Sequence, residues 1–167
     1  ERVQMDGADL TFVLGEVHPV MGAPLVIELG TRMDANTAFD VVITYRTSPS
    51  SSAVQWLRPE QTAGGTHPYL FTQCQAIHAR SLFPCQDTPG AKMTYSAKVT
   101  APDPLTALMS AIPLGEPADV GDGKRCFEFE QRVPIPPYLL ALAVGNVEAV
   151  EIGPRSKVWS EPEMVQA

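Results

Sequence analysis

Short segments in which apolar and polar residues alternate are the clearest pattern along this chain. In Phe39–Tyr45 every second residue, beginning with Phe39, is aromatic or aliphatic, and polar residues stand mostly between them. Because successive side chains of a strand point to opposite faces, this spacing predicts a strand with one buried face. Lys92–Ala101 alternates in the same way, and we expect it to pair with Thr106–Ala111.

Turn residues divide the rest of the chain into further short strands. Asp6-Gly7 stands between two apolar segments, Val3–Met5 and Leu10–Leu14, and suits the tight hairpin turn whose two central residues need positive φ. The same reasoning predicts about nine strands in all. The others are Pro24–Leu29, Arg125–Val133, Leu139–Val150 and a strand that begins at Lys157–Trp159.

The segments without alternation are predicted to be loops. Gln55–His67 is polar and contains glycine, so we expect it to be irregular, and Leu114–Lys124 is predicted to form a hairpin tip. Helix is expected only as a turn around Ala76–Leu82 and at the C-terminus. The sequence therefore predicts an all-β fold built of two antiparallel sheets or one curved sheet, with very little helix.

Composition narrows the function classes. Twelve basic residues face 19 acidic ones, a net charge of −7, and no basic cluster is present, which argues against binding nucleic acid or an anionic membrane. No apolar run approaches the roughly 20 residues that span a bilayer. Three cysteines cannot all pair within one chain, so reduced thiols and a cytoplasmic location are expected. Because the chain opens at Glu1 without an initiator Met, we expect an internal segment of a longer protein.

The strongest local candidate for chemistry is the pair Gln73 and Gln75, within His67–Arg80. If this stretch is extended, the two side chains share a face and offer both amide donors and carbonyl acceptors. Such a surface suits a peptide backbone or a free amino terminus. The alternative is that both amides satisfy backbone groups of an irregular loop.

Other constellations are weaker. Asp87-Thr88-Pro89 favours a turn in which the Asp87 carboxylate caps backbone donors, and the alternative is a carboxylate that orients a substrate amine. A set of two histidines and two cysteines matches no zinc spacing: His67, Cys74, His78 and Cys85.

The known hydrolase motifs are missing from this sequence. Three histidines could serve as a base, but no Gly-x-Ser-x-Gly accompanies them, and no glycine loop has the spacing that cradles a phosphate. The closest pair of histidines, His67 and His78, is eleven residues apart, and Glu follows neither, so this chain cannot form a His-Glu-x-x-His zinc site.

Several segments together resemble the M1 zinc aminopeptidases, in the branch of leukotriene A4 hydrolase and aminopeptidase B. The resemblance covers nearly the whole chain and is densest between Thr47 and Glu161. It is carried by SPSSSAVQWLRPEQTAG at 48–64, by the run at 67–80, by PCQDTP at 84–89, by ALMSA at 107–111, by VPIPPYL at 133–139, by IGPR at 152–155 and by VWSE at 158–161.

This resemblance implies that residues 1–167 are an incomplete, saddle-like N-terminal β domain. In that family a zinc catalytic domain and a helical C-terminal domain follow, and the zinc enzyme removes N-terminal amino acids from peptides; in one member it also opens an epoxide. The zinc cofactor would then belong to the full-length parent, whose catalytic domain is a partner of this one. This chain alone is expected to be inactive, and strand edges left unpaired predict self-association.

The resemblance also assigns roles to one loop, Gln73-Cys74-Gln75-Ala76. By family analogy Gln75 helps to hold the free amino group of a peptide, while Gln73 and Ala76 line its path. No catalytic and no metal-binding residue is expected in this chain. The competing interpretation is a stand-alone, non-catalytic β module that associates with other proteins, and a third is an independent small hydrolase.

Overall fold

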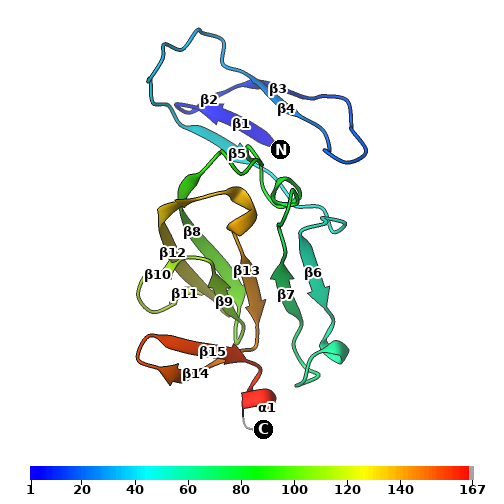
Figure 1. The fold of residues 1–167 in the computed structure, drawn as a ribbon, viewed down its shortest axis with the longest axis vertical. Helices are drawn as coiled ribbons and strands as arrows, with labels where there is room; N and C mark the ends of the chain where they lie inside the picture. Colours follow the sequence, from blue (N-terminus) through cyan, green and yellow to red (C-terminus); the bar gives the residue numbers. More distant parts are fainter. Residues whose placement is uncertain (166–167) are drawn as a thin grey trace.

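The computed structural model describes residues 1–165, which fold into strands with only short helical turns. Figure 1 shows an elongated molecule, with β1–β5 at one end, the larger sheets in the middle, and β14, β15 and α1 at the other end. The predicted all-β class is confirmed. Within residues 1–165 the strands form five separate antiparallel sheets, however, rather than the expected one or two. No helix within residues 1–165 has the length and apolar character needed to cross a membrane.

The N-terminal end consists of two small sheets. The first has the order β2-β1-β5, and the second pairs β3 with β4. The predicted hairpin at Asp6-Gly7 is confirmed, because Met5 pairs with Ala8 and the two turn residues have φ of 52° and 80°. The bounds of these strands are β1 Arg2–Met5, β2 Ala8–Asp9, β3 Thr11–Leu14, β4 Leu25–Glu28 and β5 Val41–Thr44.

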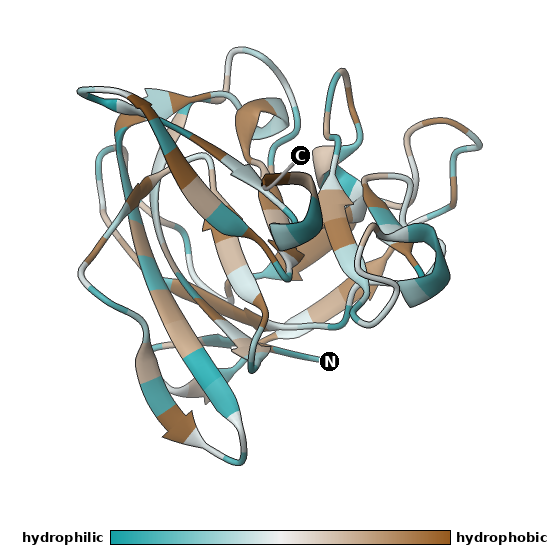
Figure 2. Ribbon diagram, turned by 90° about the horizontal axis from the view of Figure 1, so that it is seen from below, coloured by the Kyte–Doolittle hydropathy of each residue, from teal (hydrophilic) through white to brown (hydrophobic). Residues whose placement is uncertain are grey.

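The longest ladder joins β8 (Met93–Pro102) to β12 (Lys124–Ile135). Along β8 half-buried and exposed side chains alternate as the sequence predicts, and Figure 2 shows the matching alternation of hydrophobic and hydrophilic residues along the long strands. The predicted hairpin tip at 114–124 was wrong in part, because it contains the strand β11 (Ala118–Gly121), which pairs with β12. A short strand, β10 (Ile112–Pro113), also pairs with β12.

A second four-stranded sheet has the order β6-β7-β13-β9. The predicted pairing of the strand at 92–101 with that at 106–111 was wrong: β9 (Thr106–Met109) pairs with β13 (Leu142–Gly145). The prediction that 55–67 is irregular was also wrong at its start, because β6 (Val54–Leu57) pairs with β7 (Tyr69–Thr72). The sequence did not predict this strand, because the polar loop that follows it immediately makes the segment 55–67 polar as a whole.

The C-terminal part is a hairpin of β14 (Glu148–Gly153) and β15 (Ser156–Ser160). The single strand predicted at 139–150 was wrong. One strand ends at Gly145 and the next begins at Glu148, and the two belong to different sheets. The expected helical turn is confirmed as the 3-10 helix η2, and the C-terminal one as α1. The helical bounds are η1 Pro59–Gln61, η2 Ala79–Ser81, η3 Pro137–Leu139 and α1 Pro162–Val165.

Buried side chains form two clusters. The larger lies between the two four-stranded sheets and contains Ala101, Leu105, Ala107, Phe127 and Phe129. The smaller contains Ala53, Cys74 and Ala79, with Leu82, Phe83, Cys85 and Tyr138 packed against it. The second cluster matters for function, because Cys74 belongs to the loop that carries the candidate glutamines.

Candidate functional site

The glutamine loop, defined as Gln73–Ala76, connects the end of β7 to the turn that leads into η2. Its first residue extends the edge of β7, where the Gln73 backbone N–H donates to the Ala53 carbonyl at 2.8 Å. The chain then turns, and the His78 N–H donates to the Cys74 carbonyl at 2.9 Å. The stretch is therefore not extended through Gln75, and the Gln75–Ala76 peptide bond is cis.

Cys74 anchors the loop. Its side chain is 2% exposed, packed in the small cluster with Ala53 and Ala79, which are fully buried. Burial raises the pKa of the Cys74 thiol, so the side chain stays neutral, as expected for an apolar site. Gln73, Gln75 and Ala76 are exposed on the outer side of this anchor.

The two glutamine side chains have different surroundings. The Gln73 side-chain oxygen accepts the backbone N–H of Gln75 at 3.0 Å, so it helps to shape the turn. The Gln75 carboxamide makes no hydrogen bond to any other group of residues 1–165. Of the pair expected from the sequence, Gln75 alone thus has both its oxygen and its NH₂ group available to a ligand.

A cluster of hydroxyl groups and one imidazole borders the loop. The Ser52 hydroxyl lies 2.7 Å from His78 Nδ1 and donates to the Ser81 hydroxyl at 3.2 Å. The Ser81 hydroxyl in turn donates to the His78 carbonyl at 2.8 Å. Either atom can be the donor in the 2.7 Å contact between the Ser52 hydroxyl and His78 Nδ1, according to the tautomer of the imidazole.

The Asp87 carboxylate binds Arg80 in η2 rather than its own turn. Its carboxylate is 3% exposed and accepts the Arg80 backbone N–H at 3.1 Å and the Arg80 Nε–H at 3.0 Å. The guanidinium also donates to the Asp87 carbonyl at 2.8 Å and to the Met21 carbonyl at 3.4 Å. Asp87 therefore caps one backbone donor, but the donor is Arg80, seven residues earlier, and not a residue of the turn that the sequence predicts at Asp87-Thr88-Pro89.

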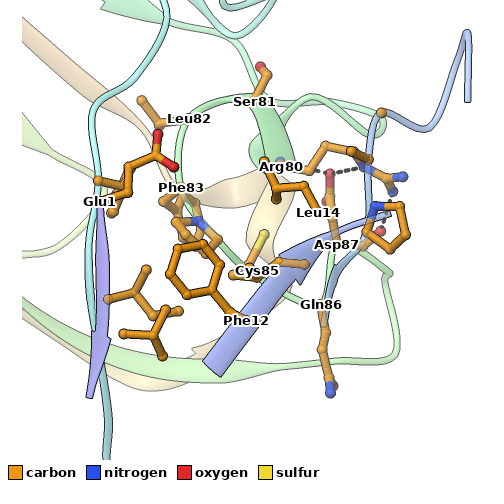
Figure 3. Close-up of a pocket in the computed structure, with 18 of the residues that line it drawn as sticks. Glu1, Phe12, Leu14, Arg80, Ser81, Leu82, Phe83, Cys85, Gln86 and Asp87 are labelled. Carbon is orange, nitrogen blue, oxygen red and sulfur yellow. Dashed lines mark hydrogen bonds and ion pairs between the residues drawn. The ribbon is translucent and has the colours of Figure 1, made fainter. Parts of the chain in front are cut away.

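A groove of about 940 Å³ lies between the two N-terminal sheets and the segment Arg80–Asp87. Figure 3 shows Phe12, Phe83 and Cys85 beside it, with the Arg80–Asp87 ion pair at one side. Burial, with a smaller contribution from the Asp87 charge, raises the pKa of Cys85 to about 11. The lining includes no residue of the glutamine loop, so groove and loop are separate features.

No group of three or more His, Cys, Asp or Glu side chains within residues 1–165 could hold a metal ion. His67, Cys74, His78 and Cys85 do not converge, because Cys74 and Cys85 belong to the apolar cluster while His78 bonds Ser52. The residues present therefore do not fit a catalytic zinc ion.

Comparison with known proteins shows the family to which this domain belongs. A sequence model described as "Peptidase M1 N-terminal domain" matches residues 5–139. The chain belongs to this family. Its membership also favours a peptidase domain over the stand-alone association module that the sequence left open.

Individual relatives of this M1 N-terminal domain are similar over nearly its whole length. It is 48% identical to leukotriene A-4 hydrolase of Xenopus laevis over 99% of this chain and 27% of that protein. It is 46% identical to leucine aminopeptidase 2 of Yarrowia lipolytica over 97% of this chain and 24% of that protein. The chain thus spans about a quarter of the length of these relatives.

Solved structures agree with the fold of the M1 N-terminal domain. The yeast LTA4 hydrolase structure superposes with a TM-score of 0.84 at 40% identity, covering 97% of this chain and 24% of that one. An M1 zinc metallopeptidase from Deinococcus radiodurans superposes with a TM-score of 0.67 at 20% identity, over 95% of this chain and 35% of that one, and so shares the fold.

Sequence reasoning missed the groups that surround the glutamine loop of this M1 domain. Ser52 appeared only as part of a resembling stretch, and His78 as a rejected metal ligand and as one of three histidines that could serve as a base. They come together across 26 residues, and their spacing carries no signal for that contact. Only the serine-rich composition of 48–52 marked the segment, and it indicates a loop equally well.

Proposed function

We propose that this domain forms part of the substrate site of a zinc aminopeptidase, in which the Gln75 carboxamide binds the free amino group of a peptide. The single observation that carries the proposal is the state of Gln75. Its side chain is exposed and makes no hydrogen bond to another group of residues 1–165, and the neighbouring residue of its loop, Cys74, is fixed in the core. A carboxamide oxygen accepts from an ammonium group, and its NH₂ donates to a peptide carbonyl.

The glutamine loop supports binding rather than catalysis. It offers Gln75 as a donor and acceptor, exposes Ala76 beside it, and uses Gln73 to hold the turn. None of these side chains can transfer a proton at neutral pH or attack a peptide bond. We therefore assign the catalytic step and the zinc ion to the catalytic domain of a longer parent protein, which is the expected partner of this domain.

The parent and its location are part of the same proposal. The relatives named leukotriene A-4 hydrolase and leucine aminopeptidase 2 support an enzyme that acts on peptides with a free N-terminus. A gene that continues beyond Ala167 into His-Glu-x-x-His would agree with it, and a stop codon there would contradict it. A cytoplasmic location stays a prediction.

Substitution of Gln75 in the full-length parent tests the proposal. A hydrogen bond to a charged group contributes about 1.5–3 kcal/mol, and the exposed position favours the low end, so Gln75→Ala should raise KM for an aminoacyl p-nitroanilide about tenfold. Zinc content and melting temperature should not change. The matched control is Gln86→Ala, which removes an equally exposed glutamine outside the loop.

Two results would contradict the proposal. If KM for Gln75→Ala equals that for Gln86→Ala, the carboxamide does not bind the substrate. If Gln75→Ala loses zinc instead, the residue supports the fold of the metal domain.

A further inference from the structure

The glutamine loop is held from outside by a segment that lies more than 20 residues earlier in the chain. The Ala53 carbonyl accepts the Gln73 N–H, and the Ala53 N–H donates to the Ser81 hydroxyl at 3.1 Å. Ser51 also contacts Ser81, at 3.0 Å between hydroxyl oxygens, and is 8% exposed. One short segment therefore touches both the beginning of the loop and the helical turn that follows it.

Ser52, His78 and Ser81, here called the serine–histidine cluster, close a ring of hydrogen bonds at the far end of the loop. His78 Nδ1 is hydrogen-bonded to the Ser52 hydroxyl, which also contacts the Ser81 hydroxyl, and Ser81 donates back to the His78 carbonyl. The His78 N–H meanwhile holds the Cys74 carbonyl. His78 is thus held by its side chain, its backbone N–H and its backbone carbonyl, and it stands three residues after Gln75.

The cluster is poorly placed to contribute much to global stability. Ser52 is exposed and His78 is half-buried, whereas the apolar contacts nearby come from Ala53, Cys74 and Ala79. Hydrogen bonds at such positions add little to the free energy of unfolding, since water replaces them readily. They do restrict how far the turn after Cys74 can move, and a binding group gains affinity when its loop is ordered before the ligand arrives.

We infer that the serine–histidine cluster positions the glutamine loop, so that Ser52 and His78 act on peptide binding through the Gln75 carboxamide. This inference rests on the proposed function. Ser52 and His78 are positioning residues: no reacting atom needs to touch them.

The test uses the full-length parent and compares Ser52→Ala with Ser50→Ala. Both remove a hydroxyl from the same loop, but within the described residues the Ser50 hydroxyl bonds Ser48 alone. Loss of one such hydrogen bond corresponds to about a 3- to 10-fold effect, so Ser52→Ala and His78→Ala should raise KM by that factor with kcat and zinc content unchanged. Ser50→Ala should behave as the wild type.

Two further variants distinguish a positioning role of the serine–histidine cluster from a general contribution to the fold: a conservative rescue at His78 and a double variant of Ser52 and Gln75. His78→Asn keeps a side-chain amide that can donate or accept close to the place of Nδ1 and should restore KM to within about twofold of the wild type, which His78→Ala cannot do. In the Gln75→Ala background, Ser52→Ala should have less than about a twofold further effect on KM, because the group that it positions is gone.

The outcomes separate the two proposals. If Gln75→Ala itself leaves KM unchanged, the proposed function fails and takes this inference with it. If Gln75→Ala raises KM but Ser52→Ala matches Ser50→Ala, only the positioning role is wrong. Full multiplication of the Ser52 and Gln75 effects, or a failure of His78→Asn to rescue, would also overturn it.

Discussion

Removal of the Asp87 carboxylate is the most informative test of whether the ion pair between Arg80 and Asp87 stabilises the segment that lines the groove. The Asp87 side chain is 3% exposed, and the side chain of its partner Arg80 is 23% exposed. Breaking a buried pair costs about 3–5 kcal/mol because it strands a charge. Arg80 keeps two carbonyl acceptors and some access to water, so we expect Asp87→Ala to lower the free energy of unfolding by about 3 kcal/mol.

Urea unfolding of the chain, followed by circular dichroism, measures this loss. With a slope of about 2 kcal/mol per molar urea, the midpoint should fall by about 1.5 M, and the melting temperature by about 6–12 °C. Glu128→Ala is the matched control, because it breaks an ion pair with Lys98 whose side chains are 45% and 71% exposed. That variant should lose less than about 1 kcal/mol.

The reciprocal variant sharpens the reasoning. Arg80→Ala leaves the carboxylate, which has less access to water than the guanidinium, without its cation, so its loss should be at least as large as that of Asp87→Ala. The double variant should lose less than the sum of the two single variants. A midpoint shift for Asp87→Ala no larger than that for Glu128→Ala would refute the assignment of a stabilising buried pair.

Two further predictions concern the core and the groove. Gly145→Ala should lower stability by about 1–3 kcal/mol in the same assay, because its new Cβ would overlap the Tyr69 ring, whereas Gly90→Ala, with open space around it, should be neutral. The Cys85 thiol, with its pKa raised to about 11 from 9.0, should react with iodoacetamide at pH 8 about 100-fold more slowly than a free thiol. The Cys85 thiol then keeps its proton to a higher pH in the folded state than in the unfolded state, so the free energy of unfolding should fall as pH rises from about 9 to 11. Cys85→Ala should flatten that fall. A Cys85 that is alkylated at the free-thiol rate would contradict both the slow alkylation and the pH dependence.

Local patterns in the sequence were sufficient for individual strands and turns. The alternation along β8 and the Asp6-Gly7 turn are properties of neighbouring residues, so they can be predicted without knowing the rest of the fold. The candidate loop was also found locally, from two glutamines that flank a cysteine. Its geometry was not, because the assumption of an extended chain fails where β7 ends at Thr72.

By itself the sequence determined individual strands such as β8, the alternation of side chains along them, and the family to which the domain is similar. The tertiary structure alone decided that β8 pairs with β12 and that Ser52 meets His78. It also decided that Gln73 turns inward to its own loop while Gln75 stays free. The physical reason is that alternation specifies the face of a side chain but not its neighbour. Contacts between distant segments depend on how all the strands pack, and hydrogen bonds are distributed only after that packing is complete.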